Sequence, residues 1–266
     1  MNKLSDNELK QREYFNALAQ RRKQAAATFE RPKLQYMEED VYRSLISLPK
    51  WQKILEIGCG DGNGRCFTEY FVSKGLDVTF MDISSDSVCH LVEKLENEGY
   101  SGFRPFSGTF KDVAPKLIGE RFDVIFFGDT LHHLTEKETV SLIEDLVSFM
   151  HKDTKIVAFE PNGHWPFWRI MPRFNKEFIW EVEKNIRHCT RSGFKHKFSA
   201  AGMNLEKYTY QRILPLFLTD RSIAIREINK LLVHIPLLRL LSAYSIIVAG
   251  ICDHLMTKKN MSDQQH

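Results

Sequence analysis

Cysteine is scarce in the sequence, and the few cysteines are not spaced for a shared role. Five occur among 266 residues, and no two of them form a Cys-x-x-Cys pair. An odd number without paired spacing argues against a disulfide framework and against a zinc site with thiolate ligands. We therefore expect a reduced, cytoplasmic protein that holds no metal ion.

An excess of one charge is also lacking, since 37 Lys and Arg residues face 34 Asp and Glu residues, for a net charge of +3. The basic residues are spread along the chain, and so we expect no nucleic-acid partner. The N-terminus does not have the apolar run of a signal peptide. Instead, Ser5 and Glu8 have the spacing of a helix capping box.

No continuous apolar run is well suited to cross a membrane. The nearest approach, residues 231–252, contains Arg239, and an arginine costs about 2.5–3.5 kcal/mol at the centre of a bilayer on insertion scales. We interpret this stretch as the end of a helix, a break at Pro236 and a final strand. We expect no transmembrane segment.

What the sequence does contain is a regular alternation of strand and helix patterns from residue 53 onward. Strands are predicted near 53–57, 77–81, 102–106, 122–127 and 154–159, with helices near 64–74, 84–97, 110–117 and 136–149. Two helices, 5–29 and 36–48, precede the first strand. This order predicts an α/β fold with a parallel sheet covered on both faces.

Four glycines at alternate positions follow the first predicted strand, in residues 54–64, Ile-Leu-Glu-Ile-Gly-Cys-Gly-Asp-Gly-Asn-Gly. Such a loop can bend sharply, and we expect its backbone N–H groups to face a bound nucleotide. The carboxylate of Glu56 disfavours a phosphate and favours a cationic or hydroxyl-rich ligand. Asp82 ends the second strand about twenty residues beyond the glycines, the spacing of an acid that binds ribose hydroxyls.

In order and spacing, the motifs of residues 50–162 resemble those of the class I S-adenosylmethionine-dependent methyltransferases. The resemblance runs through residues 56–62, Asp82, residues 122–134 and residues 156–162. It implies a doubly wound, mostly parallel seven-stranded sheet of the Rossmann-like methyltransferase fold. An antiparallel pair at 205–213 and 244–251 would complete that sheet.

The resemblance implies that S-adenosylmethionine is the cofactor and places its contacts in the glycine loop and at the strand ends: Glu56, Gly58, Cys59, Gly60, Asp82, Ile83 and Asp129. Many relatives also carry an acid after the third strand, where this chain has Gly108-Thr109-Phe110. Either Thr109 hydrogen-bonds the adenine and Phe110 stacks on it, or Asp112 takes the place of the acid. Tyr14 and Arg22 either close over the methionine carboxylate or are an ordinary packed tyrosine and solvated arginine.

Three histidines near the expected ligand-binding edge are candidate general bases: His132, His133 and His164. The competing interpretation is that one histidine of the adjacent pair packs against the following helix while the other only lines the pocket. The cofactor supplies an activated methyl group, so little catalytic machinery is required. A base helps if the acceptor is a hydroxyl or an activated carbon.

Residues 163–202 form an aromatic and basic insert after the fifth strand. It is either an acceptor pocket with a cationic rim or ordinary helix packing with a solvated basic face. Together with an apolar helix predicted around 221–241, the insert favours a small-molecule or lipid-like acceptor. We expect this acceptor to be hydrophobic or aromatic and to be methylated at an oxygen or a carbon. The predicted organisation is a helical lid at 1–49, a methyltransferase domain at 50–257 and a disordered tail at 258–266.

Two other functions remain open. An NAD(P)-dependent oxidoreductase would share the acid at Asp82, but its Gly-x-Gly-x-x-Gly pattern counted from Gly58 requires a glycine where the chain has Asn63. A non-catalytic S-adenosylmethionine-binding protein would keep the fold without turnover. The intact glycine loop argues for cofactor binding and does not address turnover.

Overall fold

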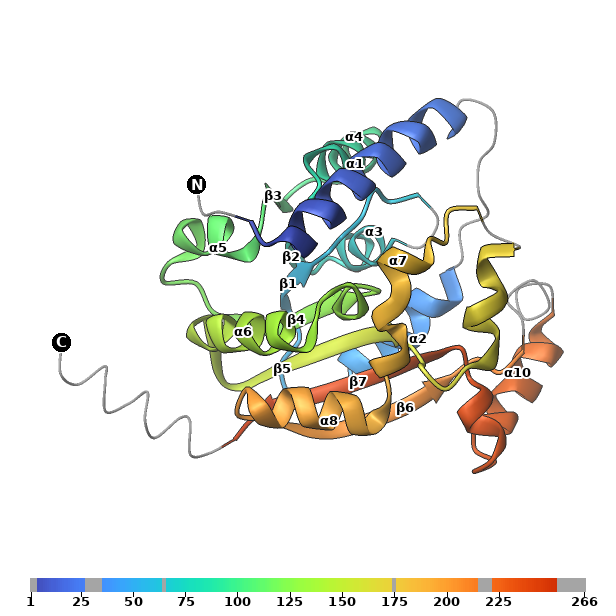
Figure 1. The fold of residues 1–266 in the computed structure, drawn as a ribbon. Coiled ribbons are helices and arrows are strands. Elements are labelled where there is room, and N and C mark those ends of the chain that lie inside the picture. The colour runs from blue at the N-terminus through green and yellow to red at the C-terminus, as the bar shows by residue number, and fades with distance from the viewer. Residues whose placement is uncertain (1–3, 27–34, 64–65, 174–175, 215–221, 253–266) are drawn as a thin grey trace.

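The fold is known from a computed structural model, which describes residues 4–26, 35–63, 66–173, 176–214 and 222–252 (Figure 1). The tail predicted at 258–266 and the last three residues of the helix predicted at 5–29 lie outside these ranges.

A seven-stranded sheet in the order β3-β2-β1-β4-β5-β7-β6 forms the centre of the molecule. The strands are β1 (Lys53–Ile57), β2 (Asp77–Asp82), β3 (Arg104–Ser107), β4 (Phe122–Gly128), β5 (Met150–Pro161), β6 (Met203–Gln211) and β7 (Tyr244–Ile251). The first five strands are mutually parallel, and β7 is antiparallel to both β5 and β6. The predicted doubly wound, mostly parallel seven-stranded sheet is confirmed.

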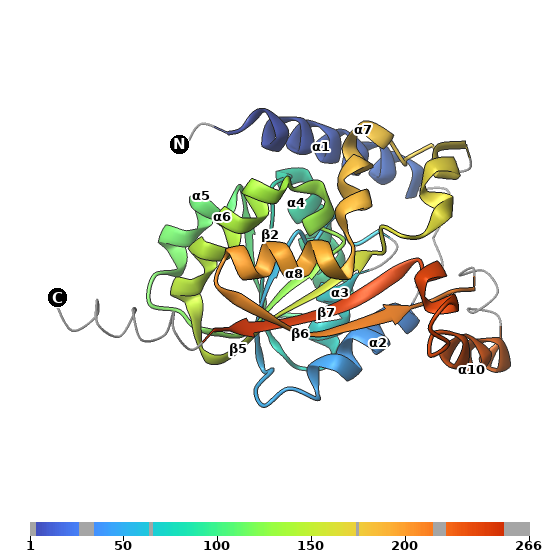
Figure 2. The same cartoon turned by 60° about the horizontal axis from the view of Figure 1, so that its bottom comes forward.

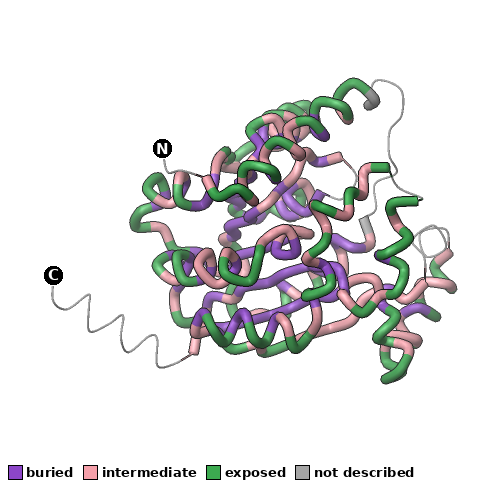
Figure 3. The backbone as a smooth tube through the Cα atoms, in the orientation of Figure 1, coloured by how far each residue is buried: buried purple, intermediate pink, exposed green. Residues whose placement is uncertain are grey.

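Helices pack on both faces of this sheet, and each face has its own apolar core (Figure 3). On one face lie α2 (Gln35–Leu45), α3 (Phe67–Ser73) and α4 (Ser85–Asn97). On the other lie α5 (Phe110–Val113), α6 (Glu136–Leu146) and α8 (Arg191–Ala200). Side chains of one strand alternate between the two cores, as Ile54 and Leu55 of β1 do, which is the period of two expected for a covered strand.

Helix α1 (Asp6–Ala26) lies outside these layers, beside α4 and close to α7 (Trp180–Glu183) (Figures 1 and 2). It begins at the predicted capping box, in which the Glu8 N–H donates to Ser5 Oγ and the Ser5 N–H donates to Glu8 Oε2. A second capping box, Thr135 with Glu138, begins α6. Each box supplies partners for N–H groups that the first turn of a helix leaves unpaired.

Several elements are shorter or more divided than the sequence patterns predict. The helix predicted at 136–149 ends at Leu146 in a 3₁₀ turn, η3 (Val147–Phe149), and β5 begins at Met150, four residues early. The helix predicted at 110–117 is α5 followed by the 3₁₀ turn η1 (Ala114–Leu117). The apolar helix predicted around 221–241 divides into α10 (Ile223–Leu232) and η6 (Leu238–Leu241), with Pro236 between them.

In its described residues, the insert after β5 contains three short helical segments before α8: η4 (Pro166–Arg173), α7 and η5 (Lys184–His188). Within the described ranges, every helix is too short or too polar to cross a bilayer.

Candidate functional site

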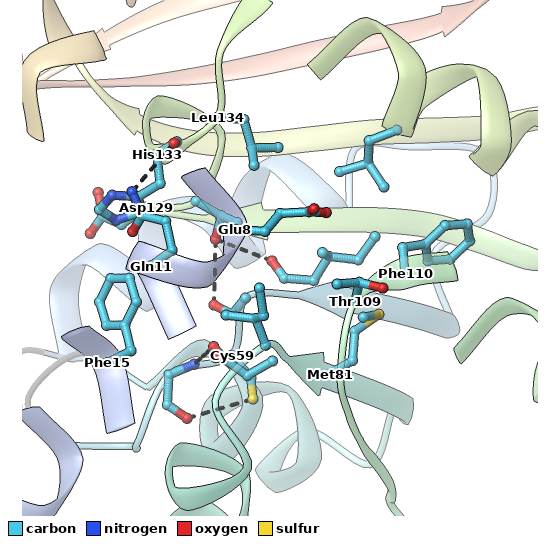
Figure 4. A pocket seen from close by; sticks show the side chains of 18 of the residues that line it. Glu8, Gln11, Phe15, Cys59, Met81, Thr109, Phe110, Asp129, His133 and Leu134 are labelled. Carbon is cyan, nitrogen blue, oxygen red and sulfur yellow. Dashed lines mark hydrogen bonds between the residues drawn. The ribbon is translucent and has the colours of Figure 1, made fainter. Parts of the chain in front are cut away.

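A cavity of about 790 Å³ opens at the carboxyl ends of β1, β2 and β4, beneath α1. This is the edge at which open α/β sheets bind ligands. Figure 4 shows His133 and Asp129 on the same side as Gln11 and Phe15 of α1. Met81, Thr109 and Phe110 gather on the opposite side. The cavity therefore has two ends with different chemistry.

The glycine loop is shaped by contacts within the protein. Gly58 has φ +82°, and a Cβ added there would lie 2.2 Å from Oγ1 of Thr130. Gly60 has φ +66°, and a Cβ added there would meet no atom of the protein within 4 Å. Both positions need a left-handed backbone, but only Gly58 is also confined by a neighbouring side chain.

The expectation that the N–H groups of this loop face a ligand is wrong for three of them. The N–H groups of Gly58 and Cys59 donate to the Met81 carbonyl, at 2.8 and 3.1 Å, and the Gly60 N–H donates to Asp82 Oδ2 at 2.9 Å. These three N–H groups therefore already donate to acceptors on the neighbouring strand β2. The loop offers a ligand its exposed glycine surface and the carboxylate of Asp82.

Glu56 lies at the floor of the cavity and is only 1% exposed. Burial raises the pKa of its carboxyl to about 8, although the hydrogen bond from Thr68 Oγ1, 2.6 Å long, acts in the opposite direction. At neutral pH the carboxyl of Glu56 is therefore mostly protonated. A bound cation would favour the negatively charged carboxylate and release this proton.

This raised pKa predicts that ligand affinity depends on pH. If Glu56 pairs with the ammonium group of the cofactor, the affinity for S-adenosylhomocysteine should rise roughly tenfold or more between pH 6 and pH 8 and then level off. Isothermal titration calorimetry across this range measures the effect. Glu56→Gln, which cannot ionise, should give weaker binding and a flat profile. A flat profile in the unmodified protein would contradict the pairing.

Asp82 ends β2 and lines the cavity with most of its side chain buried. Burial raises the pKa of its carboxyl to about 6, while N–H donors of Ser84 and Gly60 limit the rise. Each oxygen accepts one of these backbone bonds and keeps a second lone pair. The carboxylate is thus fixed in place with acceptor capacity remaining toward the cavity.

The end of the cavity where the resemblance places the adenine has the residues that the sequence singled out, with one correction. Thr109 and Phe110 both line the cavity. Asp112 does not substitute for the missing acid, because its Oδ2 accepts bonds from the N–H and the hydroxyl of Thr109 and so caps α5. That bond also occupies the hydroxyl hydrogen of Thr109, which leaves the oxygen to accept.

Of the two residues predicted on the first helix, only Arg22 reaches the cavity. Its guanidinium pairs with Asp61 at 3.2 Å and with Glu177 at 3.0 Å. Tyr14 lies outside the cavity, because its hydroxyl donates to the Glu177 carbonyl at 2.5 Å. Both side chains tie α1 to the insert. The prediction that Tyr14 closes over the methionine carboxylate does not fit this geometry.

The turn after β4 is held by Glu160 at the end of β5. Its Oε1 accepts from the N–H groups of Thr130 and Leu131, at 2.9 and 2.7 Å. Asp129, at the start of this turn, lines the cavity with φ +53°, an uncommon conformation for a residue other than glycine. Glu160 is therefore a structural residue that sets the position of Asp129 and the histidines that follow.

His132 is a buried ion-pair partner and not a base. Its Nδ1 lies 2.8 Å from Glu160 Oε2 and its Nε2 lies 3.0 Å from Glu183 Oε2. Burial alone would lower the pKa of the imidazole, but the bonds to the two carboxylates outweigh it and raise the pKa to about 10. With both nitrogens protonated and engaged, the ring has no lone pair with which to accept a proton.

His133 is the one candidate base that lines the cavity. Burial, and then the adjacent His132, lower the pKa of its imidazole to about 4, which makes it neutral at pH 7. Its Nδ1 is buried and has no hydrogen-bond partner among the described residues. Its ring meets that of Phe15 edge-on, with centroids 5.1 Å apart.

His164 is not part of this site, because it lines a separate surface hollow with Arg191, Ser192 and Lys195. It cannot serve as the base for a ligand in the cavity.

One cluster could hold a metal ion. Ligand atoms of His132, His133 and Glu183 lie within 4.8 Å of one another. In the structure the imidazolium of His132 already supplies a positive charge between Glu160 and Glu183, and we assign no metal to the cluster.

Sequence reasoning missed several residues of the site: Gln11, Phe15, Thr130 and Glu183. Gln11 and Phe15 differ by four positions, so they share a helix face, but nothing in the sequence shows which face of α1 meets the cavity. Glu183 lies 51 positions from His132, and no local signal pairs them. Thr130 lies within the quoted motif, and its tight contact with Gly58 could have been suspected.

Comparison with known proteins supports the resemblance. Residues 54–153 match the family model described as a methyltransferase domain. No curated protein sequence matches the chain. The matched segment spans β1 to the start of β5 and so includes the glycine loop, Asp82 and the histidine pair.

Solved structures with the same fold include magnesium protoporphyrin IX methyltransferase (ChlM) from Synechocystis PCC 6803 with bound S-adenosylhomocysteine. It is 14% identical, with a TM-score of 0.59, over 91% of this chain and 98% of that chain. The CcbJ methyltransferase from Streptomyces caelestis is 13% identical, with a TM-score of 0.59, over 90% of this chain and 98% of that chain. A methyltransferase from Archaeoglobus fulgidus is 17% identical, with a TM-score of 0.57, over 83% and 96%.

At these identities the solved structures show a shared fold, and the family match over residues 54–153 adds the activity. Residues 54–153 therefore form a methyltransferase domain that uses S-adenosylmethionine as its cofactor.

Proposed function

We propose that the enzyme transfers the methyl group to an oxygen or carbon of a small acceptor with hydrophobic or aromatic character. The observation that carries this proposal is the single cavity that joins the glycine loop, Asp82 and His133 under the roof formed by α1. Its volume of about 790 Å³ is within the range of small-molecule sites, roughly 300–1,000 Å³.

The fixed roof favours a small acceptor over a polymer. Asn7 Nδ2 donates to the His133 carbonyl at 3.2 Å and to Glu138 Oε2 at 2.8 Å, and Ser5 Oγ donates to Glu138 Oε1 at 2.9 Å. At its other end, α1 is tied to the insert through Arg22 and Glu177. A nucleic acid or protein substrate would have to displace these contacts. We therefore propose residues 1–49 as a lid and residues 163–202 as the insert that secures it, attached to a catalytic domain at 50–257.

The cofactor fits the remaining groups. Glu56 would pair with the ammonium of the methionine part, Asp82 would accept from the ribose hydroxyls, and Phe110 would stack on the adenine. Gly58, Cys59, Gly60, Ile83 and Asp129 also line the cavity and would surround the cofactor. The bound cofactor supplies an electrophilic methyl group, and so the protein must mainly hold the acceptor in line with it and exclude water.

His133 would take the proton of the acceptor. Its imidazole is neutral at pH 7, lies on the side of the cavity away from the adenine end and is covered by Phe15 (Figure 4). Apolar neighbours such as Leu134 and Phe15 suit an acceptor with a hydrophobic body.

Replacing this histidine should separate catalysis from binding. His133→Gln should lower kcat roughly 100-fold or more, the usual contribution of a positioned base, while the affinity for S-adenosylhomocysteine changes less than threefold. Turnover and calorimetry on the same preparation measure the two quantities. His164→Gln is the control and should leave both unchanged. An unchanged kcat in His133→Gln would remove this residue as the base.

Transfer of a labelled methyl group tests the acceptor class. The enzyme is incubated with labelled S-adenosylmethionine and with panels of phenols, isoprenoid and polyketide compounds, RNA and denatured protein. Label in a hydrophobic small molecule supports the proposal, and label confined to RNA or protein would overturn it. Asp82 would also suit an NAD(P)-dependent oxidoreductase, but the glycine pattern of that class requires a glycine where the cavity has Asn63.

A further inference from the structure

Exposed apolar side chains are concentrated in two segments outside the cavity. Among the described residues, thirteen large apolar side chains are exposed, and nine of them lie in residues 166–173 and 223–241. These nine are Phe167, Ile170, Ile223, Ile228, Leu231, Ile235, Leu237, Leu240 and Leu241. Apolar clusters of this kind mark interaction surfaces.

The two segments lie side by side, and we call them together the apolar-basic surface. Asn162 connects them, because its carbonyl accepts from Trp168 Nε1 at 2.8 Å and its Nδ2 donates to the Leu240 carbonyl at 3.2 Å. Figures 1 and 2 both show η4 at the same end of the molecule as α10 and η6. The two segments are therefore neighbours in the fold.

Helix α10 is anchored to the rest of the fold by polar groups, and several of its apolar residues are exposed. Asn229 Oδ1 accepts from the N–H groups of Ile213 and Leu214, at 2.9 and 3.0 Å, and Ser222 caps the helix. On the outward side, Leu231 is 70% exposed, and beyond the helix Leu237 is 80% exposed. The exposed apolar side chains of α10 therefore do not contribute to the apolar core of the described residues.

The same segments concentrate positive charge. They contain five basic residues, Arg169, Arg173, Arg226, Lys230 and Arg239, and one acid, Glu227. Their net charge of +4 exceeds the +3 of the whole chain, so the other residues together are slightly acidic. Arg226 is partly neutralised by Glu39, at 3.7 Å, and Lys230 by Glu227, whereas Arg169 and Arg173 are exposed.

We propose that the apolar-basic surface binds the interface of an anionic lipid bilayer, with Leu231, Leu237 and Phe167 entering the acyl boundary and the exposed Arg169 and Arg173 contacting lipid headgroups. Proteins that lie on a membrane without crossing it typically present leucine and phenylalanine next to arginine. An anionic membrane attracts each exposed cation of this surface, and the two segments contain a single acid, Glu227, to oppose that attraction. The inference does not depend on which acceptor is methylated.

Vesicle co-sedimentation of the full chain tests this inference. Vesicles of phosphatidylcholine with phosphatidylglycerol should bind the protein roughly tenfold or more tightly than vesicles of phosphatidylcholine alone, and added salt should weaken that binding. Leu237→Asp should reduce binding to the anionic vesicles roughly tenfold or more. Ile118→Asp is the matched control, because Ile118 is also 80% exposed but lies at η1, and it should bind as the unmodified chain does.

The charge contribution has its own pair of variants. Arg169→Glu should weaken binding to anionic vesicles by roughly tenfold, and Arg121→Glu, at an exposed site outside the surface, should not. Equal binding to both kinds of vesicle, or equal binding of Leu237→Asp and Ile118→Asp, would overturn the inference. So would a dimer in sedimentation velocity that Leu237→Asp dissociates without any vesicle binding, because the surface would then join two copies of the chain. None of these results bears on methyl transfer.

Discussion

Asp82→Ala should weaken the binding of S-adenosylhomocysteine by roughly 100-fold or more, because it removes a charged acceptor that would hold two ribose hydroxyls, each bond contributing about 1.5–3 kcal/mol. The carboxylate is fixed by the N–H groups of Gly60 and Ser84. Its loss therefore also loosens the glycine loop. Titration calorimetry gives the affinity, and circular dichroism shows whether the fold is retained.

Asp77→Ala is the control for this effect. Asp77 begins the same strand but is exposed at its opposite end, far along β2 from the cavity. It should bind S-adenosylhomocysteine with unchanged affinity. If Asp82→Ala binds as tightly as Asp77→Ala, the ribose role of Asp82 is wrong.

Gly58→Ala should lower the free energy of unfolding by roughly 2–5 kcal/mol. A side chain at φ +82° costs about 1–2 kcal/mol. Overlap of the new Cβ with Thr130 Oγ1, at 2.2 Å, adds about 1–3 kcal/mol. Chemical denaturation without ligand measures the loss, and in a thermal scan it corresponds to a fall of roughly 5–15 °C in Tm.

Gly60→Ala separates the two causes. It shares the left-handed backbone, at φ +66°, but its Cβ would meet no protein atom within 4 Å. Only the backbone cost, about 1–2 kcal/mol, should appear. Equal losses in the two variants would mean that the contact with Thr130 contributes nothing.

The parallel strands could be predicted from the sequence because burial and turn chemistry are local, whereas the seven-stranded sheet with its antiparallel pair followed from the family resemblance. Strands Lys53–Ile57 and Tyr244–Ile251 have the predicted bounds, since each is an apolar run ended by polar or glycine residues. The glycine loop and Asp82 each follow a predicted strand, and this placed the site at the carboxyl edge of the sheet, where the cavity lies. Boundaries failed where a helix passes into a 3₁₀ turn, as at Leu146, because both conformations satisfy the same apolar spacing.

The roles of individual side chains could not be read from the sequence where they depend on distant partners. His132 and His133 are adjacent and chemically identical, yet Glu160 and Glu183 make one a buried cation while the other stays neutral. Tyr14 is turned away from the cavity by a carbonyl of Glu177. Such distinctions arise from contacts between residues 28 to 163 positions apart.

Thermal stabilisation of the purified chain by S-adenosylhomocysteine, compared with oxidised nicotinamide dinucleotides, tests the central claim most directly. A ligand at about 100 times its Kd adds roughly 2.7 kcal/mol to the free energy of unfolding, which a thermal scan detects. The account predicts a rise in Tm with S-adenosylhomocysteine, no rise with the dinucleotides, and loss of the rise in Asp82→Ala. A rise with a dinucleotide and none with S-adenosylhomocysteine would contradict it.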